Sequence, residues 1–136
     1  MIWGCCRLTW HVENCREHAH LKVDFKHSGL EREINSDVAT VAYRIIQEAL
    51  TNVVKHAHAT QVDIILMKRA EQLVLIIEDN GIGFDPQAIP DNGHLGVFGM
   101  RERAQMIDGN LVIESTPGKG TTIIVEVKHA NSFIAR

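Results

Sequence analysis

The sequence lacks any apolar run that approaches the roughly 20 residues a helix needs to span a bilayer. It also lacks an excess of positive charge, because 14 Lys and Arg residues stand against 17 Asp and Glu residues, for a formal net charge of -3. Nucleic-acid-binding modules are usually clearly basic, so this balance argues against that class. The first residues, MIWGCC, lack the basic region, apolar stretch and small-residue cleavage site of a secretory signal. These absences predict a cytoplasmic location and no nucleic-acid partner.

Cysteine is scarce, and its three copies (Cys5, Cys6 and Cys15) all lie near the N-terminus. An odd number clustered at one end is not a disulfide framework, so we expect reduced thiols. The spacing does not match the paired CxxC pattern of zinc sites, and adjacent cysteines chelate one ion poorly. With 136 residues, 45% of them hydrophobic, the chain is predicted to form one soluble globular domain.

The N-terminal segment changes its hydrophobic period along its length. Residues 7–19 place apolar side chains at helical spacing and predict a short helix, whereas residues 20–26 alternate as a half-buried strand does. Ser28 and Gly29 predict a turn, and residues 30–34 predict a short returning strand.

The longest periodic segment follows Ser36 and Asp37, either of which is a suitable N-cap. Its apolar residues recur three or four positions apart over about five turns and form one continuous stripe. The stripe consists of Val38, Val41, Ala42, Ile45, Ala49, Val53 and Ala57. We expect this segment to be the core helix.

Two later pairs of segments predict β-hairpins. Residues 61–67 and 73–77 alternate as strands across a short connection, and residues 111–114 and 122–127 repeat this arrangement. Helices and antiparallel hairpins in this order predict an α/β two-layer sandwich, with a mixed, mostly antiparallel sheet covered on one face by helices.

Three polar side chains recur along the core helix. On a helical wheel of about 100° per residue, Asn52 lies about 40° from Glu48, and Lys55 lies about 20° away on the other side. All three are therefore predicted along the edge of the buried face. Glutamate can act as a base, asparagine offers a neutral oxygen that suits Mg²⁺, and lysine offers positive charge for a phosphate. Taken alone, a solvated helix flank explains these residues better.

A glycine-rich motif, Asp79-Asn80-Gly81-Ile82-Gly83-Phe84-Asp85, directly follows an apolar strand. An acidic residue followed by Gly-x-Gly lets the backbone turn sharply and approach a ligand closely. A carboxylate there can accept hydrogen bonds from an exocyclic amine such as that of adenine. Pro86 occupies the place of the third glycine of a dinucleotide fingerprint, and Gly118-Lys119-Gly120 lacks the spacing of a P-loop. An ordinary turn remains the alternative for the motif alone.

A second glycine-rich motif runs from Gly93 to Arg103 and leads into a helix that we predict over residues 100–108, ended by Gly109. A helix N-terminus presents free N–H groups and the positive end of the helix dipole to an anion. The weakly periodic stretch 79–99 is also long enough to close over a ligand as a lid. An ordinary surface loop is the alternative.

Taken together and in this order, these segments resemble the catalytic ATP-binding domain of sensor histidine kinases, in the superfamily that includes gyrase, the Hsp90 chaperone and MutL. Residues 43–57 (YRIIQEALTNVVKHA) resemble the N box of that family, in the form found in nitrate/nitrite-type sensor kinases. Residues 79–85 resemble the first glycine box, residues 95–103 the short second box of the same subfamily, and residues 118–121 the closing Gly-x-Gly-Thr element. The resemblance covers roughly residues 20–128 and implies a Bergerat-type ATP-binding fold.

The resemblance also implies a role for each matching polar residue. Asn52 would ligate a Mg²⁺ ion that bridges the ATP phosphates, and Glu48 would help to activate the attacking histidine of a partner domain. Lys55 would neutralise phosphate charge, and Asp79 would bind the adenine amino group. Positioning and charge neutralisation of this kind are what phosphoryl transfer mainly requires.

The remaining implied contacts shape the site. Gly81 and Gly83 would form the base pocket, Gly96 and Gly99 would hinge the lid beside the triphosphate, and Thr121 would close the floor. Two arginines of the second box can contact phosphate or form structural ion pairs: Arg101 and Arg103.

In this family the phosphorylated histidine lies on a dimerising helical hairpin that precedes the ATP domain, and residues 11–14 (HVEN) match its motif poorly. We therefore expect residues 1–19 to be a residual linker helix, residues 20–129 to be the ATP domain and residues 130–136 to be a tail. The chain is expected to be a monomeric piece of a longer kinase, itself cytoplasmic or membrane-anchored, that does not autophosphorylate alone. The implied partners are the histidine-bearing hairpin and a response regulator.

Two other functions remain open. One is a standalone protein kinase that resembles anti-sigma serine kinases, against which the form of the N box and second glycine box counts. The other is a nucleotide-binding module whose ATP occupancy governs contacts without phosphoryl transfer, against which the intact Glu48, Asn52 and Lys55 argue.

Overall fold

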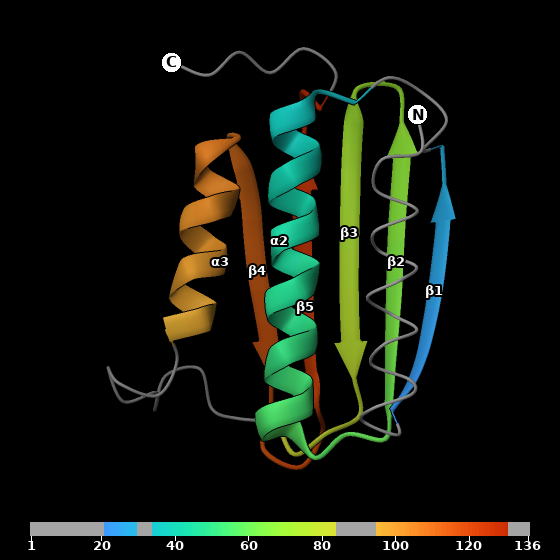
Figure 1. The fold of residues 1–136 in the computed structure, drawn as a ribbon, viewed down its shortest axis with the longest axis vertical. Helices are drawn as coiled ribbons and strands as arrows, with labels where there is room; N and C mark the ends of the chain where they lie inside the picture. Colours follow the sequence, from blue (N-terminus) through green and yellow to red (C-terminus); the bar gives the residue numbers. More distant parts are fainter. Residues whose placement is uncertain (1–20, 30–33, 84–94, 131–136) are drawn as a thin grey trace.

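A five-stranded sheet with the strand order β1-β2-β3-β5-β4 organises the chain. The computed structural model describes residues 21–29, 34–83 and 95–130 (Figure 1). The strands are β1 (Lys22–Ser28), β2 (Gln61–Arg69), β3 (Gln72–Asp79), β4 (Gly109–Ser115) and β5 (Thr121–Val127). Only the β1–β2 pair is parallel among them. The predicted mixed, mostly antiparallel sheet is therefore confirmed.

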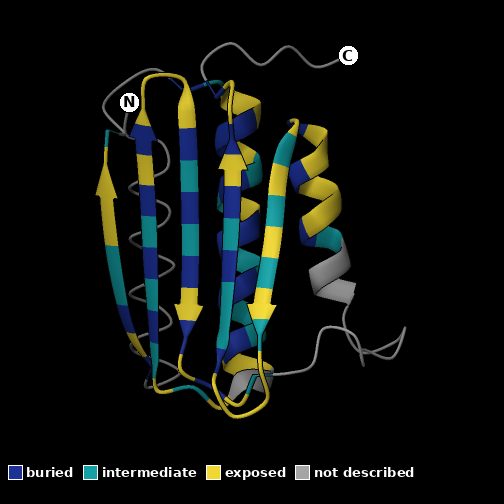
Figure 2. Cartoon of the chain, turned by 180° about the vertical axis from the view of Figure 1, so that it is seen from behind, coloured by how far each residue is buried: buried dark blue, intermediate teal, exposed yellow. Residues whose placement is uncertain are grey.

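Two helices lie on the same face of this sheet, as Figure 1 shows. They are α2 (Ser36–Asn52), which continues into the π-helical turn η1 (Val53–Ala57), and α3 (Leu95–Met106). Side chains along β2 and β3 alternate between buried and more exposed, because successive residues of a strand point to opposite faces (Figure 2). The core between the layers includes Ile45, Ile46 and Leu50 of α2, Val62 and Ile64 of β2, and Leu75 and Ile77 of β3. The predicted two-layer sandwich is confirmed.

The α2 helix begins at Ser36, one or two residues earlier than predicted from the two candidate N-caps. Its N-cap is Asn35, whose side-chain oxygen accepts hydrogen bonds from the backbone N–H groups of Asp37 at 2.8 Å and Val38 at 3.4 Å. Asparagine caps a helix as well as serine or aspartate does, since its oxygen satisfies N–H groups that have no partner within the helix. Ser36 and Asp37, the predicted caps, instead form the first helical turn, where the negative charge of Asp37 is favourable.

The α3 helix also differs from its prediction. It begins at Leu95, five positions before the predicted residue 100, so the last part of the expected loop is helical. It ends at Met106, and the left-handed backbone that follows belongs to Asp108, with φ of 53°. Gly109 therefore opens β4 rather than ending the helix. Aspartate tolerates this conformation because its short side chain can bond locally.

Several predicted segments lie outside the described residues: the helix over 7–19, most of the strand over 30–34 and the central part of the lid. At the other end, Ala130, which we placed in the tail, is fully buried. Its N–H donates to the Glu71 carbonyl at 2.7 Å, and its carbonyl accepts from the Asn35 N–H at 2.8 Å. Ala130 thus packs with the domain. Within the described residues, no helix is both long and apolar enough to cross a bilayer.

Candidate functional site

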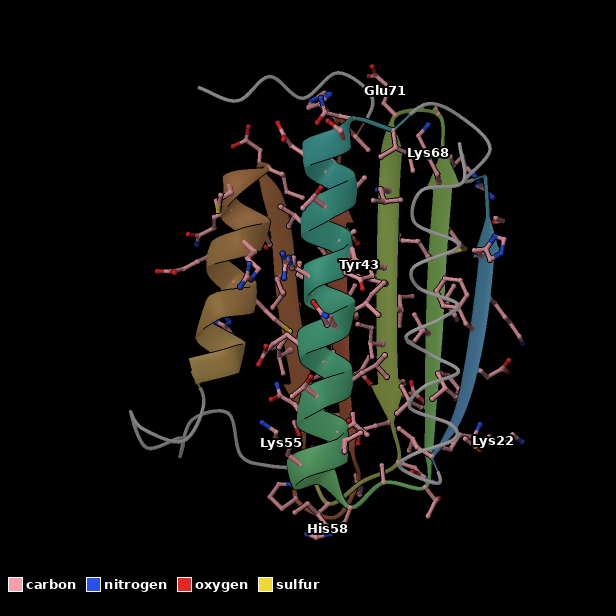
Figure 3. The ribbon with its side chains drawn as sticks, in the orientation of Figure 1. Lys22, Tyr43, Lys55, His58, Lys68 and Glu71 are labelled. Atoms are coloured by element: carbon pink, nitrogen blue, oxygen red, sulfur yellow. The ribbon has the colours of Figure 1, made fainter. Side chains whose placement is uncertain are left out.

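One end of the sandwich gathers the segments that carry the sequence motifs. The strand β3 ends there, β5 begins there, and the C-terminal end of α2 and the start of α3 lie at the same end (Figure 1). Figure 3 shows Lys55 at this end on the side of α2 that faces α3, with His58 beyond it, whereas Lys68 and Glu71 lie at the opposite end. The topology therefore brings together motifs that are up to about 70 positions apart in the chain.

Asp79 is the last residue of β3, where it pairs with Val62 of β2 and Thr121 of β5. Only 9% of its surface is exposed. The backbone N–H of Gly81 donates to Oδ1 of Asp79 at 2.8 Å, and the N–H of Thr121 also donates to this carboxylate. A carboxylate offers about four lone-pair positions, so these two donors leave acceptor capacity for a ligand.

Burial raises the pKa of Asp79 above its ordinary value. The two backbone N–H groups act in the opposite direction, and the neighbouring charge of Glu78 adds to the rise. The folded protein therefore holds the proton on Asp79 more tightly than the unfolded chain does. Such a perturbed carboxyl, placed among turns rather than in the apolar core, is typical of a functional site.

A pH dependence of stability follows from this shift. Because the folded pKa lies above the unfolded one, the stabilising contribution is complete below the ordinary value of 3.8 and is lost as pH rises through the folded pKa. We expect wild type to lose stability relative to Asp79→Asn as pH rises from about 3.5 to 7, measured by urea unfolding of both proteins. The other carboxyl groups are present in both proteins, so their contributions to the pH dependence cancel in the comparison. If wild type instead gains stability relative to Asp79→Asn, the two N–H donors lower the pKa of Asp79 by more than burial raises it.

Two loops pack backbone to backbone beside Asp79. Gly83 and Gly120 adopt left-handed conformations, with φ of 65° and 81°. A Cβ atom on Gly83 would lie 2.2 Å from the Thr116 carbonyl oxygen, and one on Gly120 would lie 2.1 Å from that of Asp79. Glycine is required at both positions, since no side chain fits between the loops. Gly81, the other predicted glycine of this motif, is buried.

Two residues that the sequence reasoning missed hold these loops in place. The Asn80 side-chain oxygen accepts from the N–H groups of Thr60 and Gln61 at 2.9 and 3.0 Å, and its amide donates to Thr60 Oγ1 at 2.9 Å. Ser115 Oγ donates to the Gly120 carbonyl at 3.1 Å and lies 2.8 Å from Thr121 Oγ1. Asn80 offered no local signal, because its partners lie 19 and 20 positions away in the chain. Ser115 offered none, because its partners lie across a hairpin.

The polar residues of the core helix occupy its last turns. Glu48 and Asn52 are half-buried in α2, whereas Lys55 is exposed and lies in η1. Lys55 thus lies in a π-helical turn, which is wider than the α-helical turn on which its wheel angle was calculated. π-helical turns are frequent at functional sites.

Gly96 and Gly99 lie within the first turns of α3 rather than in a loop. Their role as hinges of a lid stays a prediction, since the segment before Leu95 lies outside the described residues. A Cβ on Gly99 would meet open space. Arg101 and Arg103 are exposed on α3, and the described residues provide neither with an ion-pair partner.

The sequence profile described as "Histidine kinase-, DNA gyrase B-, and HSP90-like ATPase" matches residues 37–131. The signal transduction histidine-protein kinase/phosphatase DegS of Brevibacillus brevis is 39% identical over 120 residues. The match takes in 88% of this chain and 31% of DegS, so the chain spans about a third of that relative.

Solved structures share the fold at lower identity. The histidine kinase domain of the blue-light activated kinase EL346 from Erythrobacter litoralis superposes with a TM-score of 0.71 at 22% identity, covering 93% of this chain and 60% of that one. Full-length ShkA in complex with AMPPNP superposes with a TM-score of 0.74 at 18% identity, covering 93% of this chain and 30% of that one. Because the profile matches most of the chain, the chain belongs to the histidine kinase-, DNA gyrase B- and HSP90-like ATPase family.

Proposed function

We propose that this domain donates the γ-phosphoryl group of Mg-ATP to a histidine on a separate dimerisation hairpin, for relay to a response regulator. The observation that carries the proposal is Asp79, a carboxylate held by two backbone N–H groups where β3 ends. Its remaining acceptor positions suit the adenine amino group. Gly81 and Gly83 let the backbone approach the base closely, and Thr121 positions both Asp79 and Ser115 at the floor of the site.

The residues present fit a magnesium ion held jointly with ATP. Asn52 is half-buried, and within the described part of the chain its side chain makes no hydrogen bond. Its amide oxygen is therefore available as a ligand. Among the described residues, no three His, Cys, Asp or Glu side chains come together to hold a metal by themselves. This agrees with Mg²⁺ chemistry, which commonly uses one or two protein ligands together with substrate phosphates and water. When bound, the ion would neutralise phosphate charge.

The other helix residues supply the remaining chemistry. Glu48 lies one turn before Asn52 and orients the attacking histidine as a base. Lys55, in η1 on the side of the helix that faces α3, places a positive charge beside the phosphates (Figure 3). Gly96 and Gly99 add no side chain of their own at the start of α3, where backbone N–H groups can face the triphosphate. Arg101 and Arg103, both exposed on α3, are candidate further phosphate contacts.

The finer assignments rest on the sequence motifs. The Gly-Met-Arg-Glu-Arg run at residues 99–103 favours a nitrate/nitrite-sensor-type kinase, and the 39% identity to DegS supports a two-component sensor. We propose a cytoplasmic domain, monomeric by itself, with residues 1–19 as a linker helix from the hairpin and no nucleic-acid partner. Light scattering that gives a stable dimer would contradict the monomer.

Calorimetry of ATP and ADP with and without Mg²⁺, on wild type and Asn52→Ala, tests the site. We expect wild type to bind ATP more tightly when Mg²⁺ is present, and Asn52→Ala to lose about tenfold or more of that magnesium-dependent affinity, since one ligand is removed. Affinity for ATP without Mg²⁺ should change little, which separates a lost metal ligand from a damaged fold.

Equal magnesium dependence in wild type and Asn52→Ala would remove Asn52 from its proposed role. If wild type binds ATP but does not phosphorylate an added histidine-bearing hairpin, the domain would be a nucleotide-binding module without phosphoryl transfer.

A further inference from the structure

The face of the sheet that no described helix covers carries an ordered arrangement of side chains. Figure 2 looks onto this face, where the strands lie side by side in the order β1-β2-β3-β5-β4. Strand pairing aligns its side chains into rows that run across the sheet. Residues directly opposite each other in adjacent antiparallel strands have Cβ atoms about 4.5–5.5 Å apart, so the members of a row are close neighbours.

The central row is aliphatic on four strands. Ile65 pairs with Ile76, Ile76 pairs with Ile124, and Ile124 pairs with Val112. Val112 is 40% exposed, and the three isoleucines are partly exposed. We call these four residues the aliphatic row. A contiguous apolar line on an open sheet face is typical of an interaction surface rather than of a solvated one.

The adjacent row, nearer the end that carries Asp79, is acidic. Asp63 lies directly opposite Glu78, Glu78 opposite Thr122, and Thr122 opposite Glu114, while Asp24 of β1 lies beside Asp63. We call these residues the acidic row. Like charges directly opposite each other destabilise a sheet. Within the described part of the chain, none of the four carboxylates has an ion-pair partner.

We infer that this face is a docking surface for a basic amphipathic helix of another polypeptide. The aliphatic row would contact the apolar side of that helix, and the acidic row would face its lysines and arginines. Cations supplied by the partner would relieve the repulsion between the carboxylates. A divalent metal does not fit, since no three of the described acidic side chains converge on one point.

The dimensions suit one helix. Four strands about 4.8 Å apart span about 14 Å, and a helix that rises 1.5 Å per residue covers this length with about ten residues. The two rows lie two residues apart along the strands, about 6.8 Å, which is within the width of about 10 Å of a single helix. A single amphipathic helix lying across the strands can therefore contact both rows. This inference does not depend on ATP binding.

The test uses the whole chain without nucleotide and a synthetic peptide of about 14 leucines and lysines, with the leucines on one helical face. A scrambled peptide of the same composition is its control. We expect wild type to bind the amphipathic peptide and Asp63→Lys to bind it about tenfold more weakly. Glu102→Lys, which makes the same charge change on α3, should change affinity less than about twofold. Ile76→Thr should weaken binding about fivefold.

The Asp63→Lys variant also separates binding from folding. Its lysine would lie opposite Glu78, so an unfavourable pair becomes a favourable one, and the melting temperature should rise while peptide affinity falls. Equal losses in Asp63→Lys and Glu102→Lys, or equal binding of the scrambled peptide, would overturn the proposal in favour of unspecific charge attraction. Self-association of wild type that Ile76→Thr abolishes, without peptide binding, would overturn it in favour of a second copy.

Discussion

Replacing Asp79 with asparagine is expected to lower affinity for ATP about 100-fold or more while the domain stays folded. The carboxylate is held by the N–H groups of Gly81 and Thr121 and offers only acceptors. An amide would present N–H donors in place of one oxygen, so a donor would face the adenine amino group. Losing a charge-assisted hydrogen bond costs about 1.5–3 kcal/mol, and the unmatched donor adds to this loss. Calorimetry with Mg-ATP measures the change.

Two controls make this result specific. Wild type should discriminate ATP from GTP, because guanine carries a carbonyl where adenine carries its amino group, and Asp79→Asn should lose most of that discrimination. At neutral pH the variant should also be at least as stable as wild type, since burial raises the pKa of Asp79. Lost affinity without lost stability cannot be attributed to misfolding. An Asp79→Asn variant that still binds ATP tightly would remove Asp79 from the role of adenine ligand.

Replacing Gly120 with alanine is expected to destabilise the domain by about 3 kcal/mol or more. The left-handed backbone at φ of 81° alone costs a non-glycine residue about 1–2 kcal/mol. The new Cβ would also lie 2.1 Å from the carbonyl oxygen of Asp79, a backbone atom that cannot rotate away. Domains are stable by only about 5–15 kcal/mol, so thermal or urea unfolding should show a large shift.

Gly118 is the matched control in the same turn. Its φ of 82° is nearly the same, but a Cβ there would meet nothing within 4 Å. We expect Gly118→Ala to cost only the backbone term of about 1–2 kcal/mol, so the difference between the variants measures the clash. Because the clash displaces Asp79, the folded fraction of Gly120→Ala should also bind ATP more weakly. Equal destabilisation by the two variants would show that the clash of the new Cβ atom with the backbone of Asp79 adds nothing to the loss of stability.

The local patterns of the chain determined most of its architecture. Signals between near neighbours in the chain can be read without a structure. They include the apolar stripe from Val38 to Val53, the alternation in residues 61–67 and 73–77, and the glycine-rich motifs. The four ordered motifs indicated the family for the same reason. The prediction of the start of α2 failed because neighbouring residues can cap a helix equally well, and Asn35, Ser36 and Asp37 are all suitable caps.

Only the tertiary structure decided which distant groups meet. The burial of Asp79, the rise in its pKa and its N–H donor from Thr121 depend on a strand pairing across 42 positions (residues 79 to 121), which no local period encodes. The need for glycine at 120 arises from the approach of another loop, and the alignment of the acidic row depends on the register of five strands. Sequence periodicity determines which face a side chain joins, whereas its neighbours on that face are determined by topology and register.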